Sequence, residues 1–169
     1  GKPAALRQLL SRPAKPDCLR SQADHLLRVF SVIGSPGFPS DAVELRRQVE
    51  RGLRRAHYPR GQAHQLLAVI AAGDRRRELA TIRVPTLVVH GADDPLLPPS
   101  AGRETARLIP GARLQIIEGM GHDLAPGVQA LLLAAIVEHC RSSLASSEGE
   151  AGKCESVETR GCHESCMAS

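Results

Sequence analysis

Two short loops of this sequence carry residues that could act together as an acid and a base. Asp93 and Asp94 follow the apolar run that ends at Val89, and His122 follows a second apolar run that ends at Ile117. A carboxylate that accepts a hydrogen bond from the Nδ1 of an imidazole leaves Nε2 available as a general base. The two loops therefore indicate two of the three members of a catalytic triad.

The elements around these loops are expected to bring them together. Residues 86–91 form a continuous apolar run typical of a parallel strand, residues 101–109 read as a helix, and residues 113–117 read as a second strand. Catalytic groups gather at the carboxyl ends of parallel strands. Both loops should therefore open at the same edge of one sheet.

Helical periodicity covers most of the remaining chain. Asp41 lies three residues before Glu44 and predicts a capped helix start, and Gly73 is expected to end a helix. That helix should bury Leu66, Leu67 and Ile70. The expected helices are residues 3–10, 19–33, 42–55, 62–72 and 127–140.

Composition argues against several classes of protein. The net charge is +4, but Arg46 and Arg51 alternate with Glu44 and Glu50, and aromatic residues make up only 2% of the chain. Such a surface argues against binding to nucleic acid, so we expect no nucleic acid partner. No apolar run reaches the roughly 18 to 20 residues of a membrane helix, and the sequence has no signal peptide pattern. We expect no membrane association and a cytoplasmic location.

The cysteines do not form a recognisable metal site. Cys162, His163 and Cys166 lie close together, but a fourth ligand would have to be the distant Cys154. We therefore expect no metal and no other cofactor.

Longer stretches carry a family resemblance. The run IRVPTLVVHGADDPLLPP, which begins at Ile82, and the run AGRETARLIPGARLQIIEGMGHDL, residues 101–124, resemble the C-terminal end of α/β-hydrolases, in the methylesterase and lipase-like branch of serine hydrolases. The family pattern His-Gly-x-x-Asp-Pro places the triad acid at Asp94 rather than Asp93. The pattern Gly-x-Gly-His-Asp places the triad histidine at His122.

The resemblance implies an α/β fold class: the C-terminal part of an α/β-hydrolase, with two parallel strands and flanking helices, preceded by a helical cap. We expect a cap in residues 1–60, the core part in residues 61–141, and a disordered tail in residues 142–169, which is rich in Ser, Glu, Gly and Cys. Two short parallel strands do not make a stable sheet alone, so further strands are expected.

One family feature is missing. The nucleophile elbow Gly-x-Ser-x-Gly does not occur in the sequence. Ser35 stands before Pro36 with no preceding strand, and Cys18 and Cys140 fall at the edge of or within expected helices that have no elbow, so all three are poor substitutes. The chain alone is expected to be catalytically silent.

Two functional hypotheses follow. The first is the C-terminal portion of a serine hydrolase that acts on a small ester-like substrate, with His122 as base and Asp94 as its orienting acid. Epoxide or carbon–carbon bond cleavage, which uses the same two residues in related proteins, stays open. The second is a truncated, non-catalytic binding or structural module derived from such an enzyme. Whether the chain is an enzyme, its substrate and its oligomeric state remain undecided by the sequence.

Overall fold

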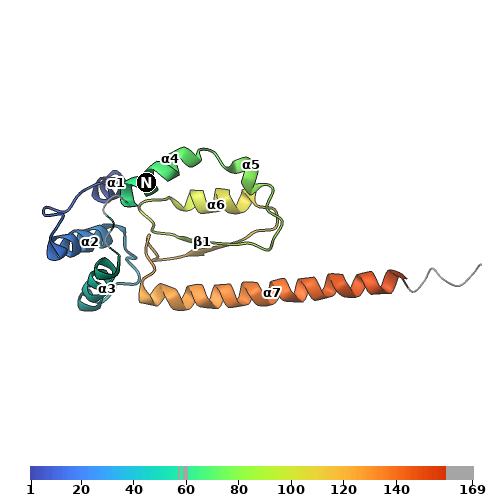
Figure 1. The fold of residues 1–169 in the computed structure, drawn as a ribbon. Helices are drawn as coiled ribbons and strands as arrows, with labels where there is room; N and C mark the ends of the chain where they lie inside the picture. The colour runs from blue at the N-terminus through green and yellow to red at the C-terminus, as the bar shows by residue number, and fades with distance from the viewer. Residues whose placement is uncertain (57, 59–60, 159–169) are drawn as a thin grey trace, which may run out of the picture. The chain divides into compact units, whose positions relative to one another are not determined.

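The computed structural model describes residues 1–56, 58 and 61–158, with the side chains of 62 and 146–158 excepted. Contacts within the chain define two compact units, one comprising Gly1–Leu132 and the other beginning at Leu133. The elements are α1 (Pro3–Leu9), α2 (Leu19–Ile33), α3 (Ala42–Arg55), α4 (Gly61–Ala72), α5 (Arg76–Leu79), β1 (Leu87–Gly91), α6 (Pro99–Leu108), β2 (Arg113–Ile117) and α7 (Pro126–Glu158) (Figure 1).

The two strands form a parallel pair, as predicted. Val89 is in register with Gln115, and Gly91 with Ile117, so both strands end at the same edge of the sheet. Helix α6 connects them and packs against both (Figure 1). Its Gly102 permits this close approach, because a Cβ there would lie 2.8 Å from the side chain of His90. The strand, helix and strand together position the two loops singled out in the sequence.

The N-terminal helices are tied to these loops by two small apolar clusters. Helix α2 packs against α1 and α3. One cluster consists of Ala5, Val29 and Ile33 with Leu96 packed against it, so it reaches the loop after β1. The second consists of Ile117, Ala125 and Val128, with Phe38, Val89 and Met120 packed against it. Burial of these side chains holds the segment after α2 beside the loop after β2.

Several local predictions are confirmed. The Asp41 side chain accepts a hydrogen bond from the Glu44 N–H at 2.8 Å and caps α3. Gly73 follows α4 with a φ of 58°, a left-handed conformation that glycine adopts without steric cost. Strand β2 has the predicted bounds. None of the helices in the described ranges has both the length and the apolar character needed to cross a bilayer.

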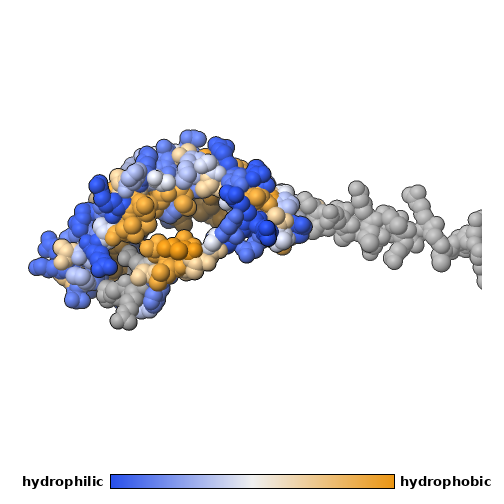
Figure 2. Space-filling view, turned by 90° about the horizontal axis from the view of Figure 1, so that it is seen from above, coloured by the Kyte–Doolittle hydropathy of each residue, from blue (hydrophilic) through white to orange (hydrophobic). Residues whose placement is uncertain are grey.

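The expected burial of Leu66, Leu67 and Ile70 is wrong. All three side chains are exposed on α4. Figure 2 shows apolar side chains gathered on the face of the molecule that α4 occupies in Figure 1. Periodicity identified the helix, but burial also requires a packing partner, and no described element covers these side chains.

The end of α7 also differs from the prediction. The helix continues to Glu158, whereas disorder was expected from Ser142 onward. A helix satisfies its backbone hydrogen bonds internally, and Ala, Leu and Glu in this stretch favour it, so low apolar content did not end it. Residues 159–169, with Cys162, His163 and Cys166, lie outside the described residues. The division into cap, core and tail remains a prediction.

Candidate active site

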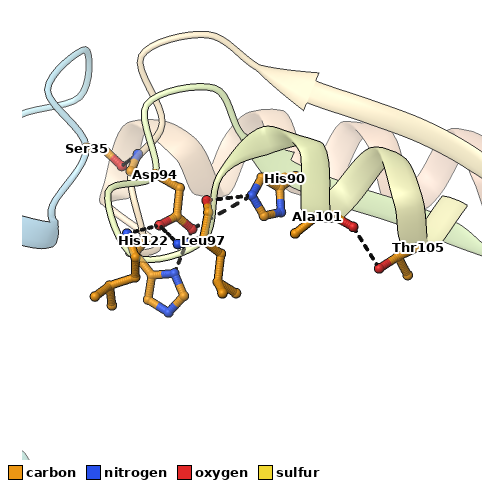
Figure 3. Close-up of polar contacts among 9 residues, drawn as sticks. Ser35, His90, Asp94, Leu97, Ala101, Thr105 and His122 are labelled. Carbon is orange, nitrogen blue, oxygen red and sulfur yellow. Dashed lines mark hydrogen bonds and ion pairs between the residues drawn. The ribbon is translucent and has the colours of Figure 1, made fainter. Parts of the chain in front are cut away.

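Asp94 and His122 lie side by side at the carboxyl edge of the sheet. The Nδ1 of His122 is 2.7 Å from Oδ2 of Asp94 (Figure 3). Asp94 belongs to the turn after β1, and His122 belongs to the loop after β2. The structure thus brings together the two residues selected from the sequence, although 28 positions separate them.

The carboxylate of Asp94 is buried and fully engaged. Its side chain is 5% exposed. Its Oδ1 accepts hydrogen bonds from the N–H groups of Leu96, at 2.8 Å, and Leu97, at 2.9 Å, which directs Oδ2 to His122. Burial by itself raises the pKa of Asp94, but hydrogen bonds from Leu97, His122 and Leu96 outweigh it and leave the pKa below its usual 3.8. The carboxylate is therefore ionised at neutral pH.

The surroundings of His122 fix its ring and leave its outer edge accessible. An ionised carboxylate only accepts hydrogen bonds, so Nδ1 of His122 carries the proton that faces Asp94. In the neutral ring, Nε2 then has a lone pair, on the edge that points away from Asp94 (Figure 3). The His122 side chain is 39% exposed. This tautomer and exposure are what a general base requires.

A second histidine, His90, stabilises the turn that carries Asp94. It was not selected as a site residue from the sequence. Nε2 of His90 lies 3.1 Å from the carbonyl oxygen of Leu97 (Figure 3). Because a carbonyl only accepts, Nε2 of His90 donates. The same nitrogen is 4.0 Å from Oδ2 of Asp94, and the side chain is 12% exposed. His90 thereby stabilises the turn that holds Asp94, and its place in the His-Gly-x-x-Asp-Pro pattern was the available signal.

Asp93 stabilises the loop that carries His122. Oδ2 of Asp93 accepts a hydrogen bond from the N–H of Gly119 at 3.0 Å, and the Asp93 N–H donates to the Met120 carbonyl at 3.0 Å. Gly119 has a φ of 75°, which favours glycine. The two adjacent aspartates therefore have separate roles. Asp94 pairs with His122 to form an acid–base dyad, and Asp93 stabilises the loop that carries the histidine.

Gly121 is required by close packing against the end of α2. A Cβ on Gly121 would lie 2.3 Å from the carbonyl oxygen of Gly34 and 2.6 Å from that of Ile33. Both neighbours are backbone atoms, so a side chain here forces the loop away from the helix.

We predict that Gly121→Ala lowers the free energy of unfolding by about 1–3 kcal/mol, because the added methyl group overpacks a filled site. The matched control is Gly52→Ala on α3, where a Cβ meets nothing within 4 Å. That variant should instead be more stable by about 0.5–1 kcal/mol, since alanine loses less backbone entropy in a helix. Urea denaturation followed by circular dichroism measures both, and equal stabilities would contradict the packing described here.

A cavity of about 690 Å³ lies beside the two loops, within the N-terminal unit. Apolar side chains from α2, α3 and the segment between them contribute to its wall, together with polar groups next to the dyad. The residues that line the cavity include Leu27, Phe30, Phe38, Leu45, Ser35 and Asp123. Its volume is within the range of small-molecule sites.

The structure supports none of the three candidate nucleophiles, Ser35, Cys18 and Cys140. The buried Ser35 hydroxyl hydrogen-bonds to Asp123 and to the N–H of Gly121. Cys18 stands immediately before α2 and Cys140 lies in α7, and both are exposed. None has the strand-to-helix elbow that makes a serine reactive in this kind of site.

Comparison with known proteins places this geometry in context. The model of the alpha/beta hydrolase fold family matches residues 1–125. The chain is 31% identical to rhodomycin D methylesterase of Streptomyces peucetius, over 136 residues that make up 80% of this chain and 45% of the relative. A rhodomycin D methylesterase of Streptomyces sp. (strain C5) is 32% identical over 139 residues, 82% of this chain and 46% of that protein.

Solved structures agree on the fold. A candidate lipase from Acinetobacter baumannii superposes with a TM-score of 0.62 at 20% identity, covering 86% of this chain and 47% of that one. The chain therefore spans about half the length of the relatives that it matches.

Proposed function

Because the chain belongs to the alpha/beta hydrolase fold family, we propose that Asp94 and His122 are the orienting acid and the general base of a serine hydrolase that cleaves a carboxylic ester. The observation that carries this proposal is the 2.7 Å contact between Nδ1 of His122 and Oδ2 of the buried Asp94. It gives the imidazole the tautomer and the orientation that acyl transfer needs.

Proton transfer follows from this geometry. Nε2 of His122 takes the proton of an attacking hydroxyl, and the buried carboxylate of Asp94 stabilises the imidazolium that forms. The same Nε2–H then protonates the departing alcohol. In the second half of the reaction His122 removes a proton from water, which attacks the acyl group. The Nε2–H of His122 then returns that proton to the oxygen of the nucleophile as the carboxylic acid leaves, which regenerates the hydroxyl and the neutral imidazole. This relay requires neither a metal nor a cofactor.

The nucleophile is proposed to come from a stretch of polypeptide other than these 169 residues, which contain no Gly-x-Ser-x-Gly sequence. We call the chain together with such a stretch the assembled hydrolase. The donors that stabilise the oxyanion would come with that stretch, since in this family they lie beside the elbow.

The substrate class is proposed from the relatives and the cavity. Two relatives are named as methylesterases, which favours an ester over an epoxide. Leu27, Phe30, Phe38 and Leu45 give the cavity an apolar wall suited to the hydrocarbon part of a small ester.

Complementation tests the proposal. The chain is produced together with the part of the Streptomyces peucetius methylesterase that it does not match, and hydrolysis of p-nitrophenyl butyrate is measured. We expect activity from the pair and none from either part alone. A fluorophosphonate, which labels activated serines, should react with the complementing part and not with this chain. A soluble complex of the two parts without esterase activity would refute the proposal, and labelling of the isolated chain would refute the external nucleophile.

A further inference from the structure

Ser35 makes two hydrogen bonds to the loop that carries His122. The residue is 6% exposed and lies in the segment directly after α2. Its hydroxyl donates to Oδ1 of Asp123 and accepts from the N–H of Gly121 at 2.9 Å. These two partners are the neighbours of His122 on either side in the chain. Figure 3 shows Ser35 beside the turn of Asp94 and the loop of His122.

Backbone contacts extend the same attachment. The His122 N–H donates to the Ile33 carbonyl at 2.7 Å, and the Gly37 N–H donates to the Gly119 carbonyl at 2.9 Å. The last residue of α2 and the segment after it therefore hold the His122 loop at Gly119 and at the consecutive residues 121–123. Among these contacts, the Ser35 hydroxyl is the side chain that bonds to both flanks of the histidine.

We propose that Ser35 is a positioning residue, which keeps Nδ1 of His122 aligned with Asp94 by clamping Gly121 and Asp123. The inference rests on the proposed function of the dyad. A hydroxyl suits this position because it donates and accepts at once, which matches one carboxylate and one N–H. Removal of the hydroxyl leaves a buried N–H and a carboxylate oxygen without this partner, and the loop gains freedom to move. Small displacements of a catalytic group lower the rate strongly.

The test compares two exchange rates in the folded 169-residue chain, labelled with ¹⁵N. Nuclear magnetic resonance measures the exchange with water of the His122 Nδ1 proton and of the Gly121 amide proton. Ser35→Ala should accelerate both by about tenfold or more. The matched control is Ser31→Ala, which removes an exposed hydroxyl that donates to the Arg28 carbonyl on α2. It should change neither rate.

Two further variants keep the test decisive if Ser35→Ala does not fold. Asp123→Ala removes one of the two bonds to Ser35 and should accelerate exchange of the His122 Nδ1 proton by several-fold. Asp123→Asn keeps an acceptor oxygen and should restore the slow rate. Circular dichroism establishes that each variant is folded.

The outcomes separate this inference from the proposed function. Unchanged exchange at His122 in Ser35→Ala, or in Asp123→Ala where Ser35→Ala does not fold, would overturn the positioning role, even with faster exchange at Gly121. Faster exchange at His122 in the folded variants, together with failed complementation of esterase activity, would support the positioning role of Ser35 and refute the proposed function. A wild-type His122 that carries no Nδ1 proton would overturn both.

Discussion

In the assembled hydrolase, His122→Ala is expected to reduce kcat/KM for p-nitrophenyl butyrate by about 10⁴-fold or more. The loss should be this large because one nitrogen, Nε2, performs every proton transfer of the proposed reaction. Alanine cannot accept the hydroxyl proton, and water admitted to its place is a far weaker base. The expected effect is on kcat more than on KM, since the ring is proposed to act in the transition state.

The control for this prediction is His64→Ala. His64 is an exposed histidine on α4, where its Nδ1 lies 3.2 Å from the hydroxyl of Tyr58. Its removal should change kcat/KM by less than about twofold, because it is exposed and its hydrogen-bond partner is Tyr58 and neither Asp94 nor His122. If His122→Ala kept activity close to that of His64→Ala, then His122 would not be the base.

Asp94→Asn is expected to lower kcat by about 10⁴-fold while the fold is preserved. Oδ1 of Asp94 accepts two backbone N–H groups, so the amide oxygen of asparagine should take that position. Its NH₂ group would then face Nδ1 of His122. Two donors cannot share a hydrogen bond, and the ring must therefore move its proton to Nε2. A neutral His122 of that tautomer cannot remove the proton of the nucleophile.

Asp93→Asn provides the matched control on the neighbouring aspartate. Asp93 accepts a hydrogen bond from the Gly119 N–H and asparagine can accept the same bond, so kcat should change by less than about threefold. Steady-state kinetics on the two variants tests the assignment. A larger loss in Asp93→Asn than in Asp94→Asn would exchange the roles of the two residues.

The core of the site could be predicted from the sequence because its signals are local. Apolar runs that end shortly before Asp94 and before His122 identify two buried parallel strands. The carboxyl ends of such strands meet at one edge of the sheet. The acid and the histidine therefore had to lie near each other once the strands were placed. The cap of α3 by Asp41 and the end of α4 at Gly73 also depend on neighbouring residues alone.

What could not be predicted depends on contacts between distant positions. Ser35 is 86 residues from Gly121, and neither sequence motif indicates that the two meet. The exposure of Leu66 and Ile70 depends on which elements pack on α4, which helical periodicity does not specify. Likewise, low apolar content near Ser142 did not stop α7, because helix continuation depends on backbone hydrogen bonds and local propensity. A cytoplasmic location stays a prediction from the sequence.

The most direct measurement of the central claim is the protonation of the His122 ring in the chain itself. The histidines are labelled with ¹⁵N, long-range ¹H–¹⁵N correlation spectra are recorded at neutral pH, and the His122 signals are assigned by their absence in His122→Gln. We predict that the neutral form of the ring carries its proton on Nδ1, bonded to Asp94, with Nε2 unprotonated. A neutral ring with its proton on Nε2 would contradict the account, because His122 could then accept no proton from a nucleophile.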